Sequence, residues 1–136
     1  MIITLKGADF SASNIGNLQG YVELDINYTD DYYWNTQNNK AVLTALANNY
    51  WASEEIAVTE GEEYQITIFA GSSTKTHAIV LTDDGYNIIY KNNHSGMLGA
   101  LNETIIVPAG ATKMLLTPYA STQAELVNTV VVKKKN

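Results

Sequence analysis

The sequence contains no cysteine and no arginine, and it has only two prolines and two histidines. Without cysteine there is no disulfide, no thiolate zinc site and no thiol nucleophile. The missing arginine removes the planar guanidinium that best grips phosphate groups and base edges. The chain also lacks the run of about 18 apolar residues that a membrane-spanning helix needs. Its apolar start, residues 1–5, is too short for a cleavable signal, so we expect neither a membrane span nor a signal peptide.

Positive charge is scarce and is concentrated at one end of the chain. The formal net charge is −6, and residues 133–135 supply three of the eight lysines. The remaining chain carries five lysines against fourteen carboxylates, so it should repel nucleic acids and anionic membranes. We therefore expect no nucleic acid and no membrane among its partners. We interpret the lysine run as a solvated end, or as a guard that keeps a sheet edge from pairing with other chains.

Alternating apolar and polar residues, interrupted by turn signals, form the main pattern of the chain. Residues 21–28 alternate strictly, as in a strand with one buried face. Three stretches then follow a strand–turn–strand pattern typical of hairpins, at residues 54–68, 78–90 and 103–116. About eight strands at this spacing favour an all-β fold, an antiparallel β-sandwich or jelly roll. With 46% hydrophobic residues, the chain suits a single β-sandwich domain at residues 21–136.

Residues 41–47 (Ala-Val-Leu-Thr-Ala-Leu-Ala) are the one stretch with helical character. Alanine is frequent there, and Leu43 and Leu46 are three residues apart, as on one face of a helix. The run is only about two turns long and its neighbours have strand patterns, so helix and strand both remain open. We expect at most one short helix in the fold, near residues 41–47.

No group of residues has the spacing of a catalytic or metal site. His77 and His94 lie outside every metal-ligand or triad spacing, and we interpret them as ordinary surface histidines. Many carboxylates come in adjacent pairs, whose side chains point to opposite faces of a strand and cannot flank one substrate. These pairs are Asp30-Asp31, Glu54-Glu55, Glu62-Glu63 and Asp83-Asp84. We expect no enzyme activity, no catalytic residue, no cofactor and no metal.

Aromatic side chains are concentrated between residues 28 and 51, which hold six of the thirteen in the chain. Exposed tyrosine and tryptophan rings stack on the apolar faces of sugars, and neighbouring asparagines could bond the hydroxyl groups. The same ring types also fill cores and oligomer interfaces. The candidates for a glycan platform or an interface are Tyr32, Tyr33, Trp34, Tyr50 and Trp51.

Several segments resemble one family. The segment Ile3-Thr4-Leu5-Lys6-Gly7-Ala8-Asp9-Phe10-Ser11-Ala12-Ser13-Asn14-Ile15-Gly16 is similar to the start of small proteins and tail-associated domains in phages and prophages of gut Bacteroidetes, including crAss-like phages. Four later motifs resemble the same group: Tyr32-Tyr33-x-Asn35-Thr36, Ile56-x-Val58-x-x-Gly61-x-x-Tyr64, Asp83-x-Gly85-Tyr86 and Ile106-Val107-Pro108-x-Gly110-Ala111. The resemblance covers most of the chain. It departs at residues 40–49, where we would expect a Ser/Gly-rich loop.

This resemblance implies a virion structural or accessory protein with a β-sandwich fold: a capsid decoration, a head-fibre component or a small tail protein. Such a protein would be made in the cytoplasm of the bacterial host and would bind other virion proteins of the capsid, fibre or tail. It would also form a homo-oligomer, for example a trimer, that hides part of the aromatic set. No catalytic residue comes with the resemblance.

Residues 1–20, rich in glycine, serine and asparagine, are expected to form an extended N-terminal strand or arm. In a virion protein this arm would become ordered on a partner, and we expect Ile2, Leu5, Phe10 and Ile15 to anchor it. The alternative function is a carbohydrate-binding module or adhesin that uses exposed aromatics of residues 28–51. The two functions are compatible, because a decoration protein can also hold a phage to surface glycans.

Overall fold

The computed structural model describes residues 20–46, 49–70, 77–94 and 99–136. These residues form twelve strands and one short helix, and all strand pairs are antiparallel, so the predicted all-β sandwich is confirmed with more strands than expected. Apart from Gly20, the expected arm lies outside the described residues. The same holds for its anchoring candidates Ile2, Leu5, Phe10 and Ile15.

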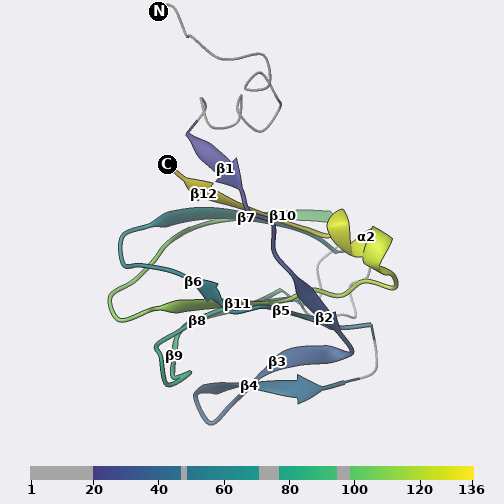
Figure 1. The fold of residues 1–136 in the computed structure, drawn as a ribbon, viewed down its shortest axis with the longest axis horizontal. Helices are drawn as coiled ribbons and strands as arrows, with labels where there is room; N and C mark the ends of the chain where they lie inside the picture. The colour runs from purple at the N-terminus through teal and green to yellow at the C-terminus, as the bar shows by residue number, and fades with distance from the viewer. Residues whose placement is uncertain (1–19, 47–48, 71–76, 95–98) are drawn as a thin grey trace, which may run out of the picture.

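Two four-stranded sheets form the sandwich (Figure 1). The first sheet has the order β1 (Tyr21–Glu23), β12 (Val130–Lys135), β7 (Glu63–Ala70) and β10 (Gly99–Ile106). The second has the order β6 (Ile56–Ala57), β11 (Lys113–Thr117), β8 (His77–Thr82) and β9 (Ile88–His94). The described chain therefore crosses between the two sheets several times, which is typical of a sandwich rather than of a sheet of consecutive hairpins.

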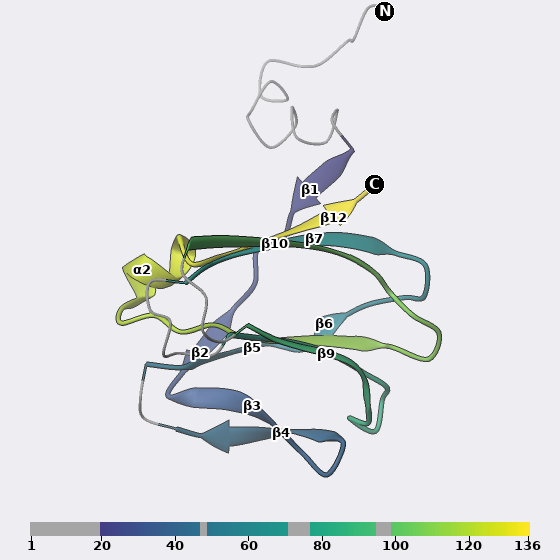
Figure 2. The same ribbon diagram turned by 180° about the vertical axis from the view of Figure 1, so that it is seen from behind.

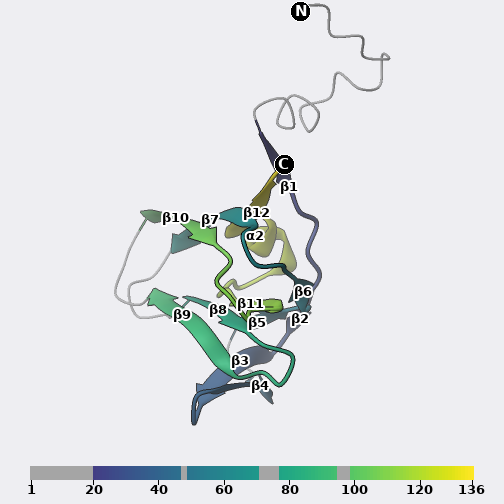
Figure 3. The ribbon, with the colours of Figure 1, turned by 90° about the vertical axis from the view of Figure 1, so that its left-hand side faces the viewer.

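A two-stranded hairpin, β3 (Tyr32–Gln37) and β4 (Lys40–Ala45), forms a third layer below the second sheet (Figures 1 and 2). Two short strands that pair with each other, β2 (Tyr28–Asp30) and β5 (Trp51–Ser53), lead the chain into and out of this hairpin. The side view shows the first sheet, the second sheet and the hairpin in succession (Figure 3). The helix α2 (Gln123–Val127) precedes β12, and no helix in the described segments has the length and hydrophobicity needed to cross a bilayer.

Two hydrophobic clusters join the three layers. The larger lies between the two sheets, and the smaller lies between the second sheet and the hairpin. The smaller cluster consists of Trp34, Ala41, Ala52, Val80 and Leu115. β8 and β11 contribute side chains to both clusters, so they are buried on both faces. This double burial explains why residues 79–81 and 114–116 are uninterrupted apolar runs rather than alternating ones.

Two of the three predicted hairpins are wrong, although their turns are present. Residues 58–62 connect β6 to β7, and residues 107–112 connect β10 to β11, but each pair of strands belongs to different sheets. Both connections contain a glycine with a positive φ, +87° at Gly61 and +85° at Gly110. They also lie side by side, because a backbone hydrogen bond of 3.0 Å joins Val58 N–H to Thr112 C=O. The repeated pattern therefore marks two adjacent crossings between the sheets.

The third predicted hairpin is confirmed, since β8 pairs with β9 across residues 83–87. The Asp83 side chain organises this turn by accepting hydrogen bonds from Gly85 N–H, 3.0 Å, and Asn87 N–H, 2.9 Å. Hydrogen bonds from the Asn87 side chain and backbone hold the pKa of Asp83 below its ordinary value. The local turn chemistry is sufficient here because the two strands are neighbours in the same sheet.

Of the two structures left open for residues 41–47, the strand is present, because residues 40–45 form β4, and the short helix of the fold is α2 instead. Asn38 and Asn39 have φ of +53° and +59°, as the two central residues of a type I′ hairpin turn require. They fold β4 back onto β3, where Leu43 lies opposite Trp34. The helix propensity of alanine amounts to a few tenths of a kcal/mol per residue, which cross-strand packing readily overrides.

The lysine run does not guard a sheet edge, although Lys133 and Lys135 are exposed to solvent as expected. Residues 133–135 belong to β12, which lies between β1 and β7 inside the first sheet. Lys134 Nζ lies 2.5 Å from Glu62 Oε2, and Lys135 Nζ lies 3.9 Å from Glu63 Oε2. The bond from Lys134 lowers the pKa of Glu62 below its ordinary value. The basic run thus offsets the acidic residues of the neighbouring strand β7 and of the turn before it.

Candidate functional site

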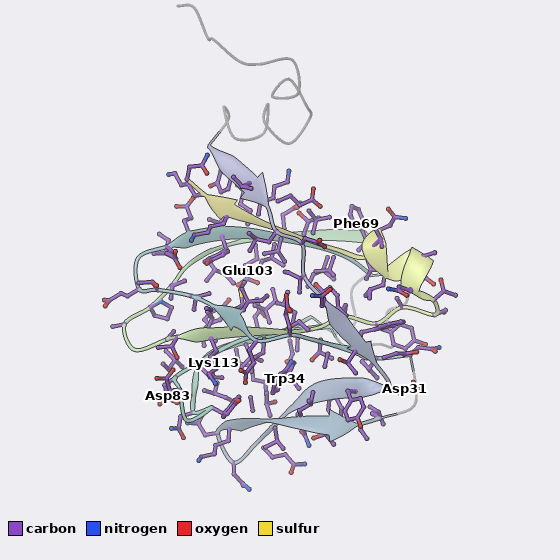
Figure 4. All side chains as sticks on the ribbon, viewed as in Figure 1. Asp31, Trp34, Phe69, Asp83, Glu103 and Lys113 are labelled. Atoms are coloured by element: carbon purple, nitrogen blue, oxygen red, sulfur yellow. The ribbon has the colours of Figure 1, made fainter. Side chains whose placement is uncertain are left out.

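The Trp34 ring is buried between the hairpin and the second sheet (Figure 4). Only 7% of its surface is exposed, and its indole N–H donates to Ser53 C=O over 2.9 Å. Its backbone N–H donates to the Thr117 hydroxyl oxygen over 3.0 Å, which ties β3 to the end of β11. Trp34 therefore attaches the third layer to the sandwich, and its ring is not available to stack on a sugar.

Trp51 is buried in the larger cluster between the sheets. It is 7% exposed, and its indole N–H donates to Ala120 C=O over 2.9 Å. Both tryptophans among the candidates for a glycan platform or an interface are thus core residues. Their burial fits the alternative that these rings fill a core, so neither tryptophan is available to stack on a sugar.

The three tyrosines among the candidates do not lie together. Tyr32 is 38% exposed, whereas Tyr33 and Tyr50 are half-buried and their ring centres are 6.2 Å apart. Tyr119, which sequence patterns did not indicate, adds a third ring 5.3 Å from Tyr50 in an edge-to-face arrangement. The tertiary structure therefore joins Tyr33 and Tyr50 and leaves Tyr32 outside the group.

A groove of about 250 Å³ lies along the β3 side of the hairpin, and we call it the Tyr33 groove. Its lining includes the rings of Tyr33 and Tyr50 and the polar side chains of Asn35, Thr36 and Asn93. Aromatic rings beside amides and hydroxyls offer both an apolar contact and hydrogen bonds to one small polar molecule. The groove can therefore bind a polar ligand with an apolar face, such as a sugar ring.

A second groove, of about 580 Å³, also includes Trp34 in its lining, and we call it the Leu43 groove. Ala41, Leu43 and Ala52 form part of its apolar lining. Glu54 and Glu55 lie at the same groove and add negative charge. Glu54 accepts hydrogen bonds from the backbone and side-chain nitrogens of Asn27, both 3.3 Å long. The groove thus combines aliphatic walls with carboxylates.

Tyr86 lies in the turn between β8 and β9 and lines the Leu43 groove, a position that sequence patterns did not indicate. Its φ of +63° is unusual for a bulky residue and directs the chain at the end of the turn. The ring lies nearly parallel to Trp34 at 6.2 Å, and Lys113 Nζ lies 4.0 Å from the ring centre. The hydroxyl also donates to Glu55. These contacts hold the ring, so Tyr86 acts as a fixed wall rather than as a stacking surface. Hydrogen bonding with Tyr86, and with Glu55, raises the pKa of Lys113 above its ordinary value.

The outer strand of the hairpin exposes three large aliphatic side chains. Val42, Leu43 and Leu46 are 53%, 48% and 37% exposed, and residues 41–50 contain no charged residue. We call residues 41–46, on the side away from β3, the β4 edge. The expectation of a helix concealed this feature in the sequence, although the charge-free run of ten residues was visible there.

The histidines and the paired carboxylates do not come together in one catalytic or metal site among the residues that the structure describes. The backbones of His77 and His94 are opposite each other at the end of the β8–β9 ladder. In the described part of the chain, no group of three or more histidine or carboxylate side chains is arranged to hold a metal ion. One adjacent pair binds different partners: Glu62 bonds Lys134, whereas Glu63 bonds Tyr21 and lies near Lys135. Glu54 and Glu55 both line the Leu43 groove.

Comparison with known proteins identifies no family for this chain. No family model matches it, and no curated protein matches it. Among solved structures, it is similar to the K3 cleaved adhesin domain of Lys-gingipain from Porphyromonas gingivalis w83, with 11% identity over 81% of this chain and 70% of that one. The TM-score is 0.36, a level of similarity from which we draw nothing about function.

Proposed function

We propose that this protein is a non-catalytic accessory protein of a virion that binds other proteins through its β3–β4 hairpin. The observation that carries the proposal is the β4 edge, where large aliphatic side chains are exposed without a charged residue among them. Apolar surface with few charges is typical of the centre of a protein–protein interface. The assignment to a virion rests on the sequence resemblance of residues 3–16 and of the four later motifs.

The position of the two ends of the described chain supports this proposal. Asn136 N–H donates to Gly20 C=O over 2.8 Å, so the first and last described residues lie at one pole of the domain. The hairpin lies at the opposite pole (Figures 1 and 3). The β4 edge therefore lies at the pole opposite Gly20 and Asn136 and can contact a virion protein there.

Replacing Val42 with lysine is expected to reduce incorporation into virions roughly tenfold or more, because an ammonium group cannot be buried in an apolar contact without a large cost. Val42 is 53% exposed, so the fold should tolerate the change. The measurement is the copy number of each tagged variant in purified particles, by quantitative mass spectrometry.

The matched control is Ile106→Lys, which makes the same kind of change at a β-branched residue that is 64% exposed on β10. Ile106 lies in the first sheet, remote from the hairpin, and its substitution should leave incorporation unchanged. Incorporation of the Val42 variant at the wild-type level would show that the hairpin is not the binding surface. Absence of the wild-type protein from virions would refute the function itself.

The Tyr33 groove supports carbohydrate binding as a second candidate function. The two half-buried rings and the amide and hydroxyl groups of the groove are the observation in its favour. Tyr33→Ala should weaken binding to any glycan that the wild type retains on an array by roughly tenfold, as removal of an anchoring ring typically does. Tyr32→Ala is the control, because Tyr32 does not line the groove. No glycan retained by the wild type, or equal retention by Tyr33→Ala, would exclude this function.

A further inference from the structure

Strand β4 presents backbone hydrogen-bonding groups on the side away from β3. Leu46 N–H donates to Asp31 C=O over 2.8 Å, which sets the alternation of bonds in the β3–β4 ladder. From this alternation, the N–H and C=O groups that point away from β3 belong to residues 41, 43 and 45. The outward direction at residue 41 is observed directly, since Ala41 N–H donates to Tyr86 C=O over 3.0 Å.

The rest of this side of β4 is an open sheet edge. A single bridge, between Lys40 and Asn87, joins β4 to the beginning of β9. Beyond it, in the segments that the structure describes, β3 is the only strand that pairs with β4. Leu43 and Ala45 therefore present backbone groups to a position without a neighbouring strand. An apolar edge without charge or proline is a template for the addition of another strand.

We propose that the β4 edge binds the β4 edge of a second copy of this chain, antiparallel, with the two-fold axis at Thr44. This inference rests on the proposed function and names one partner for its binding surface. Leu43 exchanges two backbone hydrogen bonds with Ala45 of the second copy, and the symmetric pair adds two more. This register leaves Ala41 N–H with Tyr86, whereas an axis at Leu43 would place Ala41 within the new ladder.

The same register gives each exposed aliphatic side chain of β4 an apolar partner. Val42 lies opposite Leu46 of the second copy, and Leu43 lies opposite Ala45 of the second copy. Thr44 lies opposite its own symmetry mate at a position without hydrogen bonds, where side chains are closest. Each of the three most exposed aliphatic residues of the hairpin thus loses part of its contact with water, Val42 and Leu46 on one face of the new sheet and Leu43 on the other.

Charge complementarity favours a second copy in this antiparallel orientation. Lys40 is at one end of β4, and Asp30 and Asp31 are at the other end of the hairpin, beside Leu46. Antiparallel pairing brings the Lys40 end of each copy toward the Asp30–Asp31 end of the other, twice by symmetry. Between these ends the pairing segments carry no charge, so the net charge of −6 on each chain is kept away from the contact.

The resulting assembly closes at two copies. An isologous contact uses the same surface on both subunits, so neither β4 edge remains free to bind a third copy. The two hairpins form one four-stranded sheet in the order β3–β4–β4–β3. This assembly differs from the trimer that the sequence resemblance led us to expect.

The absence of cysteine from the chain allows a direct test. In a pair without hydrogen bonds, the Cα atoms are about 4.5 Å apart, within the range that a disulfide spans. Thr44→Cys should therefore form a disulfide-linked dimer under mild oxidation, seen on a non-reducing gel. Thr104→Cys, the same change on an exposed strand of the first sheet, should stay monomeric on that gel. Light scattering of the wild-type protein should give twice its mass of 14.9 kDa.

Val42→Lys should return the protein to the monomeric mass in the same measurement, while Ile106→Lys should remain a dimer. A monomeric wild type would overturn the inference, as would a wild-type dimer in which Thr44→Cys cross-links no faster than Thr104→Cys. A monomeric wild type whose incorporation into virions still depends on Val42 would leave the proposed function standing, with a different protein at the β4 edge. A cross-linked dimer that is absent from virions would support the dimer and refute the proposed function.

Discussion

Trp51→Ala is expected to lower the free energy of unfolding by about 3–5 kcal/mol, the usual cost of removing a fully packed indole from a core. The ring is 7% exposed within the larger hydrophobic cluster. The substitution creates a cavity between the two sheets and leaves Ala120 C=O without the indole N–H that now bonds it over 2.9 Å. Native domains are stable by only about 5–15 kcal/mol, so much of the folded population could be lost.

Urea unfolding followed by circular dichroism measures this loss. Tyr32→Ala is the control, because Tyr32 is 38% exposed and substitutions of exposed residues usually change stability by less than about 0.5 kcal/mol. A loss below about 1 kcal/mol for Trp51→Ala would mean that the ring is not packed in the core. Such a result would return Trp51 to the set of candidates for a glycan platform.

Trp34→Ala is expected to destabilise the protein by a similar free energy, about 3–5 kcal/mol. The destabilised part is a different one, the third layer of the molecule. The Trp34 ring packs in the smaller cluster and bonds Ser53 C=O, so its removal detaches the hairpin from the second sheet. The main core, with Trp51 and the inner faces of both sheets, does not depend on this ring. We therefore expect the hairpin to open locally before the sandwich unfolds.

Hydrogen exchange with mass spectrometry distinguishes the two substitutions. Trp34→Ala should accelerate exchange in residues 32–45 far more than in β7, β8 and β11, whereas Trp51→Ala should accelerate exchange throughout the described strands. The same Trp34 variant should lose the dimer, since an opened hairpin cannot present the β4 edge. Uniform acceleration by both substitutions would show that the three layers unfold as one unit.

Alternation and turn chemistry predicted the fold class because both act over a few residues. Asp83 with Gly85 forms the expected turn between β8 and β9. Residues 22–28 alternate in burial as expected, but the single strand predicted for 21–28 is wrong: β1 ends at Glu23 in the first sheet, and β2 begins at Tyr28 and pairs with β5. The same kind of reasoning predicted hairpins at residues 54–68 and 103–116, where the structure has crossings between sheets. A turn motif predicts that the chain reverses, but the pairing partner of each strand depends on residues far away in the sequence.

The candidate site shows more clearly the same difference between local sequence signals and contacts between distant residues. Sequence patterns indicated the cluster of aromatic residues between 28 and 51, but they did not separate Trp34 and Trp51, which are buried, from Tyr32, which is exposed. They also assigned residues 41–47 as a potential helix, because alanine and leucine spacing is a local property. The Asn38–Asn39 turn and the pairing of Leu43 with Trp34 made this segment a strand.

The sequence by itself determined the all-β class, the positions of several turns, and the absence of cysteine and arginine with the chemistry that these absences exclude. Those properties follow from residue type, period-two alternation and positive φ at turns, which need no distant partner. Only the tertiary structure decided which strands share a sheet, that the hairpin forms a third layer, and that the β4 edge is exposed. Burial and strand pairing are properties of contacts between distant segments, so the proposed binding surface is defined by the folded chain.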